Sequence, residues 1–145
     1  MHCQILVLID CSEESRRLAA AVAAQFGAHN LCRVTLAANI SPSPSLEIRG
    51  KKVRHAQEAL ESIYDILLGS GIMARRRLVL ESSDPVTGLR AEIDAAKAAE
   101  RGYDFIVLGA HHARIEEFDA PCRGSLADQV IRRSPVPVLV LPLGG

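Results

Sequence analysis

The sequence lacks three features that would each mark a particular class of protein. Its 17 basic and 17 acidic residues give a formal net charge of zero, so no excess of positive charge favours binding to a nucleic-acid backbone. No apolar run approaches the roughly 20 residues that a membrane-spanning helix needs. The first apolar stretch begins almost at Met1 and leaves no room for a signal peptide. We therefore expect a cytoplasmic protein; the alternative is a domain excised from a larger chain.

The sequence also lacks any spacing of cysteines that would suggest a zinc site or a dithiol motif. Its four cysteines are Cys3, Cys11, Cys32 and Cys122. In a reducing compartment these are expected to be free thiols. Cys11 and Cys122 both fall in predicted loops, so the alternative for these two is a redox-sensing pair.

An alternation of strand and helix signals runs along the whole chain. Residues 4–9, 31–38, 72–80, 105–108 and 135–142 form apolar stretches of strand length. Helical signals separate them: Ser12 with two acids opens the first helix, and apolar spacing over residues 53–67 marks the second. Asp84 opens the third helix, which Gly102 is expected to end, and Ser125 opens the fourth. Residues 39–45, rich in proline and serine, are expected to form a loop.

This alternation predicts an α/β fold. Strands that alternate with helices indicate a parallel sheet with right-handed crossovers, so we expect a doubly wound, five-stranded sheet with helices on both faces. A length of 145 residues fits a single domain over residues 1–145, because domains run to about 100–200 residues. Arg75, Arg76 and Arg77 interrupt the third strand, which indicates an edge strand.

A ligand site is expected at the carboxyl ends of the strands, where the strand order reverses. Ser125 is a good N-cap, and Asp128 lies three residues further on. The free backbone N–H groups and the positive end of that helix would together make an anion site. The residues expected at this end of the sheet are Asp10, Asn39, Gly109, Gly124, Ser125 and Leu126.

Other chemistries find less support in the sequence. His111 and His112 are adjacent and, with Asp119 or Cys122, could hold a metal ion; solvated loop histidines are the simpler interpretation, because no third ligand has diagnostic spacing. Ser125 lies in no nucleophile-elbow pattern, and its capping role accounts for it.

Three segments resemble the universal stress protein family, and the resemblance covers essentially the whole chain. They are Ile-Leu-Val-Leu-Ile-Asp-Cys-Ser at 5–12, Asp-Phe-Ile-Val-Leu-Gly at 104–109, and Gly-Ser at 124–125 followed by a helix and Ser-Pro-Val-Pro-Val-Leu-Val-Leu-Pro at 134–142. The resemblance implies a strand order of 3-2-1-4-5. It also implies a homodimer and, for one branch of the family, ATP binding.

The nucleotide motif of that branch is matched only in part. It reads G-x-x-G, nine residues, then G-[ST]; Gly109, Gly124 and Ser125 match, but His112 replaces the second glycine and eleven residues follow it. Asp10 falls where the family's aspartate approaches the adenosine, and Asn39 falls near a position that is usually apolar beside the base. Binding of ATP or AMP is therefore expected to be weakened.

Three function classes follow from this resemblance. They are a nucleotide-responsive regulatory protein, a regulatory or scaffolding dimer that has lost the nucleotide, and an enzyme such as a slow ATPase. The homodimer is expected to form through the uncharged last strand, with Val136, Val138 and Val140.

Overall fold

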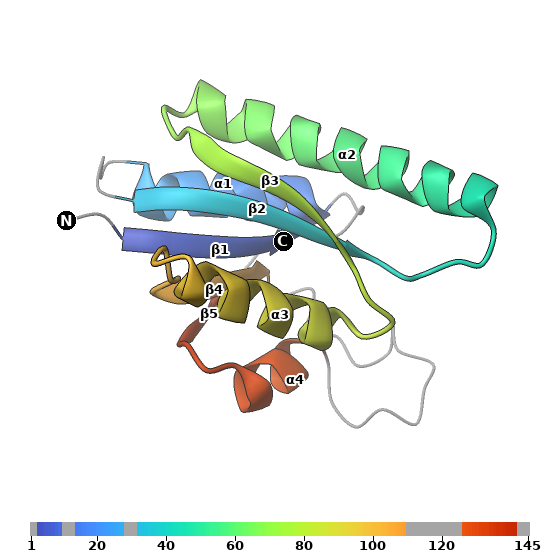
Figure 1. Ribbon diagram of the computed structural model, residues 1–145. Coiled ribbons are helices and arrows are strands. Elements are labelled where there is room, and N and C mark those ends of the chain that lie inside the picture. Colours follow the sequence, from blue (N-terminus) through green and yellow to red (C-terminus); the bar gives the residue numbers. More distant parts are fainter. Residues whose placement is uncertain (1–2, 10–13, 28–31, 110–125, 142–145) are drawn as a thin grey trace.

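The computed structural model describes residues 3–9, 14–27, 32–109 and 126–141 (Figure 1). Within these ranges five strands alternate with four helices. In chain order they are β1 (Cys3–Ile9), α1 (Glu14–Phe26), β2 (Cys32–Ile40), α2 (Leu46–Gly69), β3 (Ala74–Glu81), α3 (Pro85–Ala98), β4 (Phe105–Gly109), α4 (Leu126–Arg133) and β5 (Val138–Leu141).

The strands form one parallel sheet in the order β3-β2-β1-β4-β5. Helices α1 and α2 pack on one face of this sheet, and α3 and α4 pack on the other (Figure 1). This confirms the predicted doubly wound α/β fold and the strand order that the resemblance implies.

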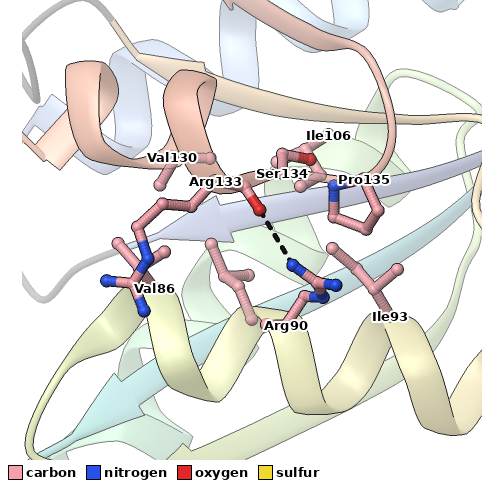
Figure 2. A pocket seen from close by; sticks show the side chains of 9 residues that line it. Val86, Arg90, Ile93, Ile106, Val130, Arg133, Ser134 and Pro135 are labelled. Atoms are coloured by element: carbon pink, nitrogen blue, oxygen red, sulfur yellow. Dashed lines mark hydrogen bonds between the residues drawn. The ribbon is translucent and has the colours of Figure 1, made fainter.

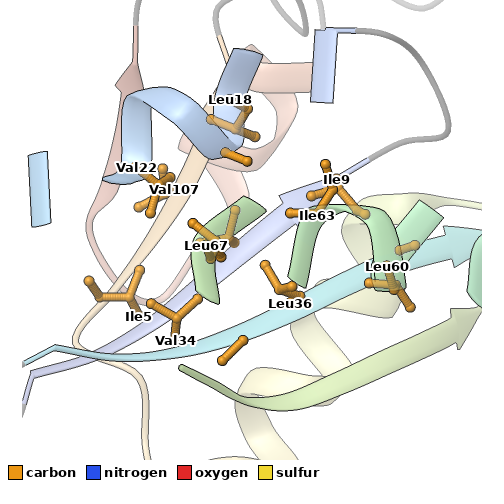
Figure 3. Close-up of a cluster of buried hydrophobic side chains, with 14 of the residues drawn as sticks. Ile5, Ile9, Leu18, Val22, Val34, Leu36, Leu60, Ile63, Leu67 and Val107 are labelled. Atoms are coloured by element: carbon orange, nitrogen blue, oxygen red, sulfur yellow. The ribbon is translucent and has the colours of Figure 1, made fainter. Parts of the chain in front are cut away.

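The middle of the sheet is buried on both faces. Ile5, Val7 and Ile9 of β1 pack under α1 and α2, whereas Leu6 and Leu8 point to the opposite face. All five side chains are at most 2% exposed. Figure 3 shows the first of these two cores, where residues of β1, β2 and β4 meet the buried stripes of α1 and α2. The apolar runs in the sequence are explained by this burial on both sides.

Glycines follow the ends of two helices, and the predicted start of a third helix is confirmed. Helix α1 ends immediately before Gly27, and α2 ends in a turn where Gly71 has a φ of +84°. The Ile72 N–H donates to the Leu67 carbonyl oxygen across that turn at 2.9 Å. Asp84 caps α3, as its position before a proline predicts. None of the described helices is long and apolar enough to cross a membrane.

Three other boundaries differ from the prediction. Strand β2 continues through Asn39 to Ile40, because both residues pair with β3, so the predicted loop begins two residues later. Helix α3 ends at Ala98 and not at Gly102; it is Glu100 that takes the left-handed conformation, with a φ of +57°. Strand β5 is confined to residues 138–141, inside the stretch predicted as a strand.

The arginines of β3 do lie on an edge strand, as predicted, because β3 pairs only with β2 in the sheet of described residues. The pairing steps from Val34–Ala74 to Thr35–Arg76 and leaves Arg75 as an extra residue. This irregularity is a β-bulge, which protects an edge against pairing with a foreign strand.

Cys3 and Cys32 are free thiols, as expected for these two. They oppose one another in the register of β1 and β2. Burial, with the nearby Asp104 carboxylate, raises the pKa of the Cys3 thiol. Cys11 and Cys122 lie outside the described residues.

Candidate functional site

The strand order reverses between two neighbouring strands. After β1 the chain passes to α1 on one face of the sheet, and after β4 it passes to α4 on the other face. Strands β1 and β4 are adjacent and parallel. Their carboxyl ends therefore flank the point where the strand order reverses, which is where doubly wound sheets bind ligands.

Half of the predicted site residues lie among the described ones. Gly109 is the last residue of β4, is buried, and opposes Leu141 of β5. Leu126 is the first residue of α4, and Asn39 lies at the carboxyl end of β2. The remaining members of the predicted site and of the metal alternative lie outside the described residues: Asp10, His111, His112, Asp119, Cys122, Gly124 and Ser125. Within the part of the chain that is described, no three histidine, cysteine or acidic side chains are grouped to hold a metal ion.

The side chain of Asn39 is engaged by the connection between β3 and α3. Its Nδ2 donates to the Ser82 carbonyl oxygen at 3.1 Å, and its Oδ1 accepts from the Ser82 hydroxyl at 2.9 Å. The same hydroxyl lies 2.6 Å from the Asp84 carbonyl oxygen. Both polar groups of Asn39 are therefore used inside the protein, where they fix the start of α3 against the end of β2.

Gly88 allows this close approach. A Cβ atom at residue 88 would lie 2.7 Å from the Asn39 Oδ1 and 2.8 Å from the Ser82 Oγ. Both distances are shorter than real contacts allow, so any larger side chain here would displace Asn39 and Ser82 from their hydrogen bonds, although glycine weakens a helix by about 1 kcal/mol relative to alanine. The sequence analysis did not identify Gly88; the available signal was a glycine inside an amphipathic helix.

Asp84 connects the two helices on this face. Its carboxylate accepts from the Val86 backbone N–H at 3.0 Å and from Arg133, at the end of α4, at 2.9 Å. Partial burial alone would raise the pKa of the Asp84 carboxyl. The hydrogen bonds from Arg133, the Val86 N–H and Thr87 outweigh that effect and hold this pKa below its usual value.

The gap between α3 and α4 is not a ligand site. Figure 2 shows it lined by apolar side chains of both helices, with the Arg90 guanidinium donating to the Arg133 carbonyl oxygen at 3.1 Å. Its volume is about 10 Å³, which is enough for one water at most. Together with the Asp84–Arg133 pair, this contact holds α4 against α3.

Comparison with known proteins agrees with this geometry. Residues 1–142 match the model of the universal stress protein family. No curated protein matches the chain.

Solved structures with the same fold cover nearly the whole chain. A universal stress protein in complex with cAMP is 19% identical, with a TM-score of 0.73 and 99% of each chain covered. The Archaeoglobus fulgidus universal stress protein in complex with dAMP is 16% identical, with a TM-score of 0.61 and 97% of each chain covered. An Arabidopsis thaliana universal stress protein family protein with AMP bound is 13% identical, with a TM-score of 0.69, covering 99% of this chain and 93% of its own.

The Asn39–Ser82 contact can be tested by truncation. We expect Asn39→Ala to lower the free energy of unfolding by about 1–2 kcal/mol, because it leaves the part-buried Ser82 carbonyl oxygen without its hydrogen-bond donor. Urea denaturation measures this difference. Gln57→Ala, at an exposed position of α2, is the control and should change the stability by less than about 0.5 kcal/mol. Equal stabilities for the Asn39 and Gln57 variants would contradict the structural role.

The charge of Asp84 can be tested by Asp84→Asn, which keeps a capping side chain and removes the carboxylate. Because the folded-state pKa of Asp84 lies below its unfolded value, its charge stabilises the protein above the unfolded pKa of about 3.9. That contribution is lost as the pH falls through the folded pKa. We therefore expect the variant to be less stable than the wild type at pH 7, with the difference shrinking in denaturation curves measured toward pH 3.

Arg133→Gln provides the matched control for Asp84, because it removes the cation and leaves the carboxylate. It should flatten the same pH dependence, and combining it with Asp84→Asn should cost little beyond Asp84→Asn alone. Full additivity of the two substitutions would show that the pair does not carry the effect.

Proposed function

Because the chain belongs to the universal stress protein family, we propose that it is a cytoplasmic regulatory protein of the stress response that binds adenine nucleotides weakly. The observation that carries this proposal is the reversal of strand order at the carboxyl ends of β1 and β4, where the chain leaves the sheet toward opposite faces; at this point we place a crevice for the ligand. ATP or AMP is the proposed ligand, since proteins of the same fold have been solved with cAMP, dAMP and AMP.

Five of the six predicted site residues have a proposed part in this cleft. Gly109 ends β4 at the crevice, which supports close approach of a ligand to the backbone there. The sequence Gly124-Ser125-Leu126 leads into α4, whose first backbone N–H groups would bind phosphate. Asp10 directly follows β1, so we propose that it contacts the adenosine.

Three features support weakened binding. His112 stands where the family motif has glycine, and a left-handed backbone there would cost about 1–2 kcal/mol, roughly a tenfold loss in affinity. The longer segment before Gly124 carries Glu116, Glu117 and Asp119, whose charges would repel a triphosphate. Asn39 holds its amide against Ser82, where the resemblance expects an apolar residue beside the base.

The second candidate function is a nucleotide-independent dimeric regulator or scaffold. The observation that favours it is the free edge of β5, which pairs only with β4 in the described sheet. None of its four residues carries a charge, and Leu139 is 37% exposed. Val136, Val138 and Val140 are half-buried against the core of the α3 face. An uncharged edge of this kind is a template for pairing, and a second copy of the chain would cover it.

Calorimetric titration with ATP and AMP tests the cleft. We expect dissociation constants above about 1 µM, which corresponds to a binding free energy weaker than about −8 kcal/mol. Ser125→Glu should abolish the remaining heat, because it places a negative charge where phosphate would bind. Ser70→Glu, exposed beyond the far end of α2, is the charge-matched control and should bind like the wild type.

Two outcomes would change this assignment. Submicromolar ATP binding that Ser125→Glu abolishes would contradict a weakened site. No heat with either nucleotide at millimolar concentration would favour the nucleotide-independent regulator.

The proposed dimer can be tested by measuring the molar mass with light scattering after size-exclusion chromatography. We expect a dimer at micromolar concentration and a shift toward monomer in Val138→Lys, because a charge in the proposed interface would have to be buried. Leu68→Lys, 46% exposed on α2, is the control and should remain dimeric. A monomeric wild type under these conditions would rule out the β5 interface.

A further inference from the structure

Arginines gather at the end of the sheet opposite to the cleft. Five of them line an open groove of about 710 Å³ at the amino ends of β2 and β3: Arg33, Arg75, Arg76, Arg77 and Arg101, here called the arginine groove. Arg33 and Asn39 are six residues apart in β2, which places the groove about 20 Å from the carboxyl end of that strand. The groove is therefore separate from the crevice between β1 and β4.

Three of these arginines have a carboxylate partner. Arg76 and Arg101 approach the same Oε1 atom of Glu92, each at 3.4 Å, and that atom also accepts from the Tyr103 hydroxyl at 3.0 Å. Arg77 pairs with Glu61. One carboxylate oxygen of Glu92 thus contacts two guanidinium groups and a hydroxyl, so the negative charge of this residue already has its partners within the protein.

The side chains of Arg33 and Arg75 have no such partner among the described residues. Neither side chain makes an ion pair or a hydrogen bond in that part of the chain, and the Nε of Arg33 is buried without an acceptor. Asp104 accepts the backbone N–H of Gln4, which lines the groove, at 2.7 Å. Two guanidinium groups that line an open groove without an acceptor leave their charge available to an anion.

Protection of the sheet edge does not account for this arrangement. Charged residues on an edge strand do discourage foreign pairing, which would explain the three arginines of β3. Arg33, however, lies on β2, which has a neighbour on both sides, and Arg101 follows α3. The bulge at Arg75 adds a residue at the same place, and bulges commonly re-aim a side chain toward a binding site.

We propose that the arginine groove binds a soluble anion that carries two or more phosphate groups. Guanidinium groups match phosphate oxygens with paired hydrogen bonds, and the two unpartnered arginines supply the charge. The volume lies within the roughly 300–1,000 Å³ of small-molecule sites. Tyr64, whose ring lies 4.4 Å from the Arg77 guanidinium carbon, adds an aromatic wall. This site goes beyond the nucleotide cleft and does not depend on it.

Calorimetric titration of the full chain with inorganic tripolyphosphate tests the proposal. We expect saturable binding to the wild type, with a dissociation constant about tenfold higher in Arg33→Gln and in Arg75→Gln, since each removes a charged hydrogen bond. Arg54→Gln, an exposed arginine of α2 outside the groove, is the charge-matched control and should bind like the wild type. Arg75 is exposed, so its variant remains informative if Arg33→Gln fails to fold.

Variants of the two sites separate this proposal from the nucleotide cleft. Ser125→Glu should leave tripolyphosphate binding in the groove intact. Binding that is lost in Ser125→Glu but unchanged in both groove variants would assign the anion to the cleft and overturn the groove proposal. Absence of tripolyphosphate binding would overturn it as well, as would groove-dependent binding only to phosphatidylserine vesicles, which would indicate a lipid surface instead.

Discussion

The burial of β1 and β4 on both faces is the constraint on which the rest of the structure depends. Leu6 and Leu8 point to one side of the sheet, and Ile5, Val7 and Ile9 to the other, all nearly inaccessible. Each fully buried side chain of this size contributes about 1.5–3 kcal/mol. Helices on both faces supply this burial, and the connections after β1 and β4 lead to opposite faces. The switch point between these strands is thus part of how the core is covered.

Sequence reasoning could predict this level of organisation because it depends on local patterns. The apolar runs of residues 4–9 and 105–108 indicate strands covered on both sides, and helical periodicity between the strands fixes the alternation. The arginines of β3 indicate an edge strand, because charged side chains are tolerated in a strand where they can reach solvent. The strand order required the family resemblance, since alternation alone does not determine which strands are neighbours.

The remaining details depend on contacts between residues far apart in the chain. Asn39 and Ser82 are separated by 43 positions, and a side chain at residue 88 would come too close to the side chains of both. No local sequence pattern predicts such a contact. The prediction that Gly102 ends α3 is wrong for a different reason. The residue that takes a left-handed conformation after a helix is usually glycine, but here Glu100 takes it and Gly102 does not end the helix.

The same long-range contacts position the start of α4, the proposed phosphate site. This helix has only eight residues and is about 12 Å long, so a displacement at one end is carried to the other. Its last residue, Arg133, is held through its side chain by Asp84 and through its carbonyl oxygen by Arg90. Asp84 is in turn joined through Ser82 to Asn39 at the end of β2. A chain of polar contacts along one face of the sheet therefore fixes the helix that would meet the ligand, so the affinity of the proposed cleft would depend on residues that need not contact a nucleotide.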